Sequence, residues 1–391
     1  MMQKKKWTLK YLIHQIHLWL GLASGIIVVI VAVTGCLFVF QKEISEVVYK
    51  KTLFISSEQT PVLPLSQLQQ KAQAALGNTQ SINFITAYKD ADRAWEFMAY
   101  KSNDSAVSYF GSIVYYRSAF INPYNGAITG IRDYKFDFFN VVKAIHWSLL
   151  LNSPYGQPIV GYSTLIFVLI LITGLILWWP KRWNKTTRKQ AFTIKWKARI
   201  KRLNYDLHNV LGFYSLVIAL ILALTGMVFA FEWFEKTVYT VANGSGGKPK
   251  SIIVKSLDTS LVSTQNPIDI AYATTLKNVR GLQRIGVSPA SGKEGVIYIY
   301  AYKDNELYYN YDALNFDQYS GKLLSQKNYS QKNSGEKITG MNYDIHVGAI
   351  AGLPGKIIVF LAGLIAASLP ITGFFVWWNK RRKIAAIKNI S

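Results

Sequence analysis

The sequence predicts an α-helical membrane protein, a four-helix transmembrane bundle from a duplicated unit with two α+β domains outside the membrane. Three observations predict this fold class. Four long apolar runs carry no charged residue, the basic residues collect beside those runs, and a set of histidine and Thr-Gly motifs occurs twice along the 391 residues.

The four apolar runs each have 21 to 23 residues, and a helix needs about 20 residues to cross a bilayer. A soluble helix of that length would normally carry polar residues on one face. Each run is therefore predicted to cross the membrane once, and an even number of crossings places both termini on one side. The runs are residues 18–40, 159–179, 209–231 and 357–378.

The net charge of +23 is concentrated beside these spans. Nineteen Lys and Arg residues lie in segments 1–13, 180–205 and 379–391, which contain no Asp or Glu. Cytoplasmic loops of membrane proteins are enriched in Lys and Arg. The three segments are therefore predicted to be cytoplasmic, and the basic charge no longer argues for a nucleic-acid partner.

The composition excludes several other classes of protein. Half of the residues are hydrophobic, which is too many for a disordered chain. The single cysteine, Cys36, excludes a disulfide framework and the Cys-x-x-Cys-His attachment of c-type haem. Cys36 is expected to be a packing residue within the first span.

The two stretches outside the membrane alternate apolar and polar residues as β-strands do, for example at Ser112–Phe120 and Val296–Tyr302. Residues 64–76 are predicted to form a helix, and Asn- and Gly-containing turns follow at 122–126 and 317–321. Two separate α+β domains are therefore predicted. The predicted divisions are 1–41 (N-terminus and first span), 42–143 (first outside domain), 144–179 (histidine segment and second span), 180–205 (basic loop), 206–235 (third span), 236–343 (second outside domain), 344–378 (histidine segment and fourth span) and 379–391 (tail).

All five histidines lie in or beside the spans. His17 and His208 are each followed by Thr-Gly after 17 residues, whereas His146 and His346 precede Thr-Gly by 27 and 26 residues. The repeat therefore pairs His17 with His208 near the cytoplasmic face and His146 with His346 near the outer face. One member of each pair comes from each half of the chain, as a pseudo-two-fold axis would require.

Two opposed imidazoles at each face favour haem, because histidine is a standard axial ligand of haem iron and a helical bundle can enclose the ring. The sequence thus predicts His17 and His208 as axial ligands of one haem iron, and His146 and His346 as axial ligands of a second. His14 lies three residues before His17 and is the alternative ligand. Zinc, which normally takes third and fourth ligands, and a proton relay are the competing interpretations.

The glycines of the four Thr-Gly motifs fall at the depths of the two histidine pairs. A flat macrocycle needs helix surfaces without side chains nearby, so these glycines are predicted to pack against haem. Ordinary helix–helix packing is the alternative explanation. The four are Gly35, Gly226, Gly174 and Gly373.

These motifs resemble the PepSY-associated transmembrane family. The matching residues are His17-Leu18-Trp19-Leu20-Gly21-Leu22 with Thr34-Gly35, and Ile145-His146 with Thr173-Gly174 through Trp178-Trp179-Pro180-Lys181-Arg182-Trp183. The turn at 122–126 is similar to the Asp-Pro-x-x-Gly stretch of PepSY domains, with Asn for Asp. The second copy departs further, with Gln318 in place of the proline.

The resemblance implies a bacterial inner-membrane protein with two periplasmic PepSY-like domains and two b-type haems. Its iron-uptake members reduce a ferric siderophore, or ferric chelate, to release ferrous iron. The electron donor is then a separate cytoplasmic flavin reductase or quinol, since the chain has no nucleotide-binding glycine loop. The alternatives are a haem b subunit passing electrons to another periplasmic reductase, and a non-redox regulatory or peptide-binding membrane protein.

The outside domains are rich in tyrosine, and one interpretation is a stacking surface for a chelate. Cross-strand packing is the simpler explanation of the same residues. They include Tyr109, Tyr115, Tyr116, Tyr298, Tyr300, Tyr302, Tyr308 and Tyr309.

Overall fold

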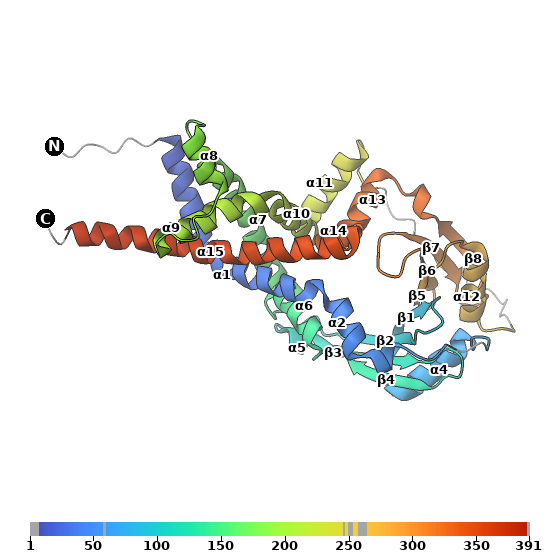
Figure 1. The fold of residues 1–391 in the computed structure, drawn as a ribbon. Coiled ribbons are helices and arrows are strands. Elements are labelled where there is room, and N and C mark those ends of the chain that lie inside the picture. Colours follow the sequence, from blue (N-terminus) through green and yellow to red (C-terminus); the bar gives the residue numbers. More distant parts are fainter. Residues whose placement is uncertain (1–7, 58–59, 245–246, 249–252, 257–263, 389–391) are drawn as a thin grey trace. The chain divides into compact units, whose positions relative to one another are not determined.

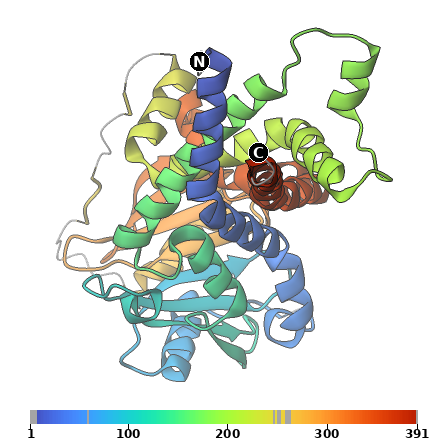
Figure 2. The same ribbon diagram turned by 90° about the vertical axis from the view of Figure 1, so that its left-hand side faces the viewer.

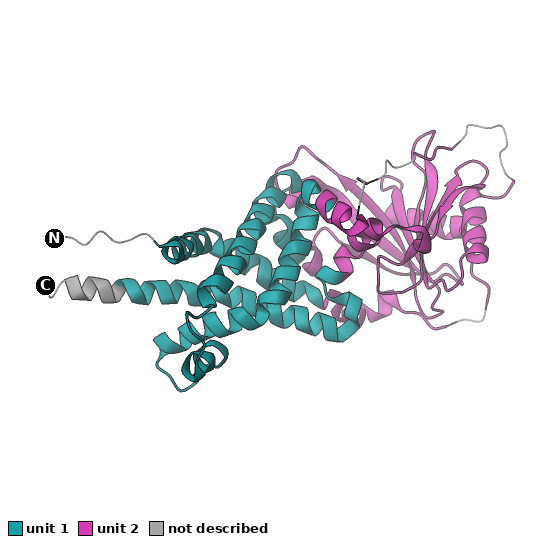
Figure 3. Cartoon of the chain, turned by 90° about the horizontal axis from the view of Figure 1, so that it is seen from above, with its two compact units in different colours: residues 1–39, 142–235, 345–391 teal, residues 40–141, 236–344 magenta. Residues whose placement is uncertain are grey.

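A computed structural model describes residues 8–57, 60–244, 247–248, 253–256 and 264–388 (Figure 1). The chain forms two compact units. A helical unit contains residues 1–39, 142–235 and 345–391, and a sheet unit contains residues 40–141 and 236–344 (Figure 3). The outermost parts of the predicted tails, residues 1–7 and 389–391, lie outside the described residues.

The helical unit contains four segments that are long and apolar enough to cross a membrane. They are α1 (Leu9–Val39), α7 (Ser153–Trp178), α10 (Gly212–Ala230), which continues α9 (Ile200–Asp206) through the π-helical turn η1 (Leu207–Leu211), and α15 (Gly352–Lys388). These helices confirm the four predicted spans, and the chain is an integral membrane protein.

The four long helices close into a bundle. Helix α1 packs against α7 and α15, and α10 packs against the same two helices. The start of α1 and the end of α15 lie at the same end of this unit (Figures 1 and 2). The arrangement therefore agrees with the prediction that both termini lie on one side of the membrane.

Two short helices carry a histidine each and precede a membrane helix: α6 (Phe138–Ser148) and α14 (Asn342–His346). Between α6 and α7 the backbone is left-handed at Leu149 and Leu150, with φ of 55° and 62°. Left-handed backbone costs a non-glycine residue about 1 kcal/mol or more. The Ser148 hydroxyl helps to hold the turn by donating to the Leu151 carbonyl at 2.6 Å.

The two halves of the chain make this connection in the same way. Ser148 is the last residue of α6, and Gly348, with φ of 75°, lies just after the end of α14. The backbone carbonyl of each of these two residues packs against a glycine in the first turn of the next membrane helix. A Cβ at Gly156 would lie 1.9 Å from the Ser148 oxygen, and one at Gly355 would lie 2.2 Å from the Gly348 oxygen. Glycine is therefore required at both contacts.

The variant Gly156→Ala should lower the thermal stability of the protein. Overpacking typically costs about 1–3 kcal/mol, and a backbone carbonyl cannot swing away as a side chain can. The measurement is the unfolding temperature in detergent, followed by tryptophan fluorescence. Gly340→Ala is the control, because a Cβ there meets nothing within 4 Å. Equal unfolding temperatures for the two variants would contradict the contact.

The sheet unit is built on eight strands: β1 (Ile82–Tyr88), β2 (Trp95–Ser102), β3 (Ile113–Ile121), β4 (Ile128–Asp133), β5 (Arg284–Ser288), β6 (Val296–Tyr302), β7 (Tyr311–Asp317) and β8 (Leu323–Lys327). All neighbouring strands are antiparallel, in the order β4-β3-β2-β1-β5-β6-β7-β8. The remaining helices include α2 (Gln41–Val48), α3 (Lys50–Leu53), α4 (Leu65–Leu76), α5 (Tyr109–Ser112), α8 (Lys185–Phe192), α11 (Glu232–Asn243), α12 (Pro267–Asn278), α13 (Ser334–Gly340), η2 (Tyr329–Gln331) and η3 (Ala349–Ala351).

The predicted helix at 64–76, the strands at 112–120 and 296–302 and both turns are confirmed. Gly126 and Gly321, with φ of 75° and 70°, each donate a backbone hydrogen bond four residues back, which closes the turn. Each half of the chain thus supplies one twelve-residue helix, α4 or α12, and four strands.

The prediction of two separate domains needs correction, because the halves share one sheet. Strand β1 pairs with β5 from Ile85↔Val287 to Tyr88↔Arg284. Helices α4 and α12 contact each other, and a single hydrophobic core runs through both halves. Each four-stranded half would otherwise expose an unpaired edge strand, and joining the two edges removes that liability.

Candidate functional site

The structure brings the four predicted histidines together as two pairs. The ring centres of His17 and His208 lie 6.2 Å apart, and those of His146 and His346 lie 6.0 Å apart. The ring planes cross at 83° and 66°. All four side chains are partly buried within the helical unit. The pairing deduced from the repeat is therefore present in the fold.

His14, the alternative ligand, lies elsewhere. Its side chain is exposed, and its Nδ1 lies 3.4 Å from the amide nitrogen of Gln15. On a helix, residues three apart share a face only approximately. Here that difference turns His17, and not His14, toward His208.

Each paired histidine contacts the threonine of a Thr-Gly motif on a neighbouring helix. The contact always joins the imidazole Nδ1 to the threonine hydroxyl, and it always stays within one half of the chain. The distances are 3.0 Å for His17–Thr173, 3.4 Å for His146–Thr34, 3.1 Å for His208–Thr372 and 2.8 Å for His346–Thr225.

The hydrogen-bond donors assign the tautomer of these histidines. Each threonine hydroxyl already donates to the carbonyl four residues before it, at 2.7–2.9 Å, so its oxygen is left to accept from Nδ1–H. Carbonyl oxygens, which can only accept, also lie at 2.8 Å from Nδ1 of His146 and 3.0 Å from Nδ1 of His208. Nδ1 therefore carries the proton, and Nε2 keeps a free lone pair for a metal.

The four glycines lie against the imidazoles. For three of them, the atom nearest to an added Cβ would be the Cε1 atom of a histidine. For Gly226 the histidine Cε1 would be the second-nearest atom, still within 4 Å. The distances to Cε1 are 3.1 Å for Gly35–His146, 3.2 Å for Gly174–His17, 3.0 Å for Gly373–His208 and 3.7 Å for Gly226–His346. The predicted depths are confirmed, and the glycines make room for the imidazole edges.

The two pairs lie far apart along the bundle. Thr34, which contacts His146, stands 17 residues after His17 on the same helix, a rise of about 25 Å. The spacing from His208 to Thr225 in the second half is the same. Together the pairs reach across most of the hydrocarbon thickness of a bilayer, about 30 Å.

Each pair brings two imidazoles together. Across residues 8–57, 60–244, 247–248, 253–256 and 264–388, no group of three or more His, Cys, Asp or Glu side chains is placed to hold a metal ion. A structural zinc site usually has four protein ligands and a catalytic one has three. Among the described residues, neither histidine pair has the three or four protein ligands of such a zinc site.

The tyrosines do not all lie on the same side of the sheet. Tyr298, Tyr300 and Tyr302 lie on the side of β6 away from the hydrophobic core, and Tyr300 also packs against Tyr311 with ring centres 5.3 Å apart. Tyr115 instead packs against the core. Cross-strand packing therefore accounts for these β6 contacts.

Cys36 is buried, and its sulfur donates to the Phe360 carbonyl at 3.4 Å and lies against Gly363. This agrees with a packing role.

The role of the four threonines was not predicted from the sequence. The recurrence of Thr-Gly was visible, but only the glycine was assigned a function.

The fold and the paired histidines define a class of protein: an integral membrane bundle with a duplicated bis-histidine site and a mixed α+β unit. Residues 14–380 match the family described as the PepSY-associated TM region, and the chain belongs to that family. No curated protein shows significant similarity to the chain.

The glycines beside the histidines allow a matched test. Gly373→Ala should lower the unfolding temperature, because its Cβ would press on His208 Cε1 at 3.0 Å. Gly226→Ala should be neutral or stabilising, because 3.7 Å is an ordinary contact and alanine is the better helix former by about 1 kcal/mol. Both variants are compared by tryptophan-monitored unfolding, and a more stable Gly373→Ala protein would show that the imidazole is not held there.

Proposed function

We propose that this protein binds two b-type haems, one between His17 and His208 and one between His146 and His346. We further propose that it carries electrons across the membrane to a ferric siderophore or another ferric chelate. The observation that supports this most is the geometry of the pairs. Two metal–nitrogen bonds of about 2 Å, with the imidazole radius of roughly 1.1 Å on each side, separate ring centres by about 6 Å.

The surroundings of the imidazoles support the same ligation. Threonine oxygens fix Nδ1 as the protonated nitrogen, which leaves Nε2 of each histidine to bind iron. Haem, when bound, would supply a one-electron Fe(III)/Fe(II) couple. The chain's own residues would place and orient this couple.

The orientation in the membrane follows from charge. Segment 180–205 contains ten Lys and Arg residues and no Asp or Glu, and such segments face the cytoplasm. The His17–His208 pair then lies near the cytoplasmic face of a bacterial inner membrane and receives electrons from a flavin reductase or from quinol. The His146–His346 pair and the sheet unit lie on the periplasmic side.

The proposed substrate is a ferric chelate in the periplasm. Hard oxygen ligands bind ferric iron more tightly than the softer ferrous ion. Transfer of one electron to the chelated iron therefore weakens the complex and releases ferrous iron for uptake.

Haem binding is tested by counting haem with the pyridine haemochrome assay. The purified protein, expressed with adequate haem supply, should contain two b-type haems per chain. His208→Ala and His346→Ala should each retain one haem, because each change removes one ligand of one pair and leaves the other pair intact. His14→Ala is the matched control and should retain two. A wild-type protein without haem would contradict the proposal.

The acceptor is tested with protein reduced anaerobically and mixed with ferric siderophores. Reoxidation of the haem spectrum should be matched by formation of Fe(II), measured with a ferrous-specific chelator. His346→Ala should lose this reaction while its remaining haem is still reoxidised by ferricyanide. If wild-type protein reacts with ferricyanide but produces no Fe(II) from any ferric chelate, the electrons go to another periplasmic reductase.

A further inference from the structure

One histidine of each pair follows a fully buried aspartate by two residues. The sequences are Asp206-Leu207-His208 and Asp344-Ile345-His346, and both aspartates have 0% exposure. Their counterparts before His17 and His146 are Gln15 and Ala144. The Asp-x-His feature therefore belongs to the second half of the chain and supplies one histidine to each pair.

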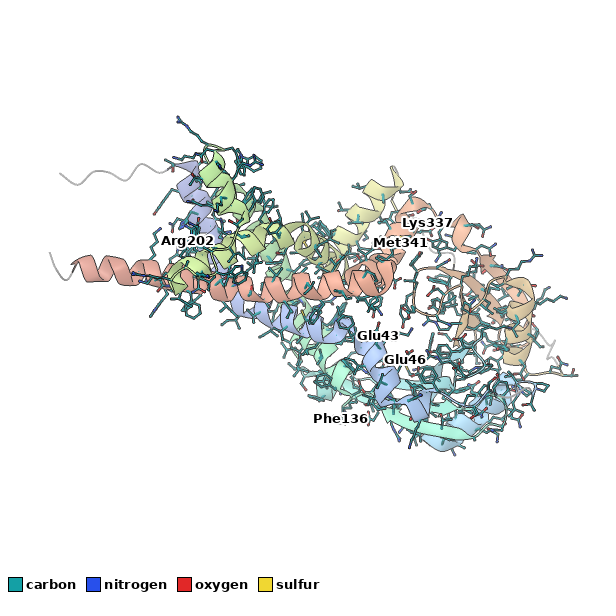
Figure 4. The ribbon with its side chains drawn as sticks, in the orientation of Figure 1. Glu43, Glu46, Phe136, Arg202, Lys337 and Met341 are labelled. Carbon is teal, nitrogen blue, oxygen red and sulfur yellow. The ribbon has the colours of Figure 1, made fainter. Side chains whose placement is uncertain are left out.

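Asp206 ties the turn that carries His208 to the preceding connection. Its Oδ2 accepts the backbone N–H of Lys195 at 3.2 Å. Arg202, labelled in Figure 4, places Nε 2.8 Å from Oδ1 of Asp206, close enough for an ion pair but without the alignment of a hydrogen bond. Asp206 ends α9, and the π-helical turn with His208 begins at the next residue.

Asp344 makes the equivalent connection for α14. Its Oδ2 accepts the backbone N–H groups of Tyr308 and Tyr309 at 3.0 and 3.1 Å. These residues belong to the loop between β6 and β7. Arg284 holds the same loop from the sheet, because it donates to the Leu307 carbonyl at 3.5 Å and its guanidinium lies over the Tyr308 ring.

Helix geometry explains how such an aspartate acts on its histidine. Side chains two residues apart on a helix point about 200° apart, so each carboxylate anchors the side of the turn opposite its histidine. Anchoring that side fixes the rotation of the turn. Removing the carboxylate would leave one or two backbone N–H groups without their partner, and such groups are costly when buried.

We propose that Asp206 and Asp344 are positioning residues, which set the rotation of His208 and His346 toward their partners. Each pair then contains one histidine anchored by an aspartate and one that is not. This inference rests on the proposed function only in the experiment that measures haem spectra. Its first test needs no haem.

The first test measures cross-linking in a Cys36→Ala background that carries His17→Cys and His208→Cys. A short reagent that joins two thiols reports how well the two positions face each other. Adding Asp206→Ala should slow this cross-link at least about fivefold, the population change expected from losing one such hydrogen bond. Asp206→Asn keeps an acceptor oxygen and should recover much of the rate, which separates positioning from failure to fold.

The corresponding test uses His146→Cys and His346→Cys with Asp344→Ala, and the same slowing is expected. Asp312→Ala is the control for both pairs. Asp312 is also buried and accepts a backbone N–H, from Tyr329 at 2.7 Å, but it precedes no histidine. Unchanged cross-linking in Asp206→Ala and Asp344→Ala, or equal slowing by Asp312→Ala, would overturn the proposal.

The second test records low-spin electron paramagnetic resonance spectra of the haem-loaded protein. Asp206→Ala should shift the signal of one haem and Asp344→Ala that of the other, while Asp312→Ala changes neither. Shifted cross-linking in a protein that never binds haem would support the positioning role and reject the proposed function. Normal spectra in both aspartate variants would reject the positioning role alone.

Discussion

The candidate site depends on one kind of interaction: the hydrogen bond that each imidazole Nδ1 donates to the hydroxyl of a Thr-Gly motif or to a backbone carbonyl one turn before it. Without an acceptor, a buried Nδ1–H would cost about 1–3 kcal/mol, and the ring would be free to turn. The threonine is itself fixed by its bond to the carbonyl four residues back. Each imidazole is therefore held against a helix through Nδ1–H, which leaves Nε2 unprotonated.

These bonds stay within each half of the chain, whereas the histidine pairs form between the halves. Each half thus orients two imidazoles by its own contacts. Each of these imidazoles then pairs with one from the other half, as a pseudo-two-fold axis requires. The same principle governs the sheet unit, where β1 from one half pairs with β5 from the other. Duplication therefore explains why the protein has two similar sites and one continuous sheet.

The second half adds an anchor that the first half lacks. His208 and His346 follow buried aspartates, while His17 stands inside the long helix α1. A residue within a regular helix needs no further support for its rotation. A histidine in a π-helical turn or in a five-residue helix does, because few helical hydrogen bonds hold it.

Much of the site could be predicted from particular residues. The spacing of 17 residues from His17 to Thr34 and from His208 to Thr225 revealed the pairing, because duplicated helices place equal spacings at equal depths. The role of the threonines could not be predicted, since each bond joins helices far apart in the sequence. The choice of His17 over His14 also needed the rotation of α1 about its axis.

By itself the sequence determined the four spans, the positive segments beside them, the repeat and the strands of each half. These features follow from local hydrophobicity, charge and periodicity. The tertiary structure alone decided that the two outside regions share one sheet and that glycine makes room for imidazole. It also decided that two buried aspartates, each two residues before a histidine, bind the backbone of neighbouring segments. Such features depend on contacts between distant residues, which local patterns do not encode.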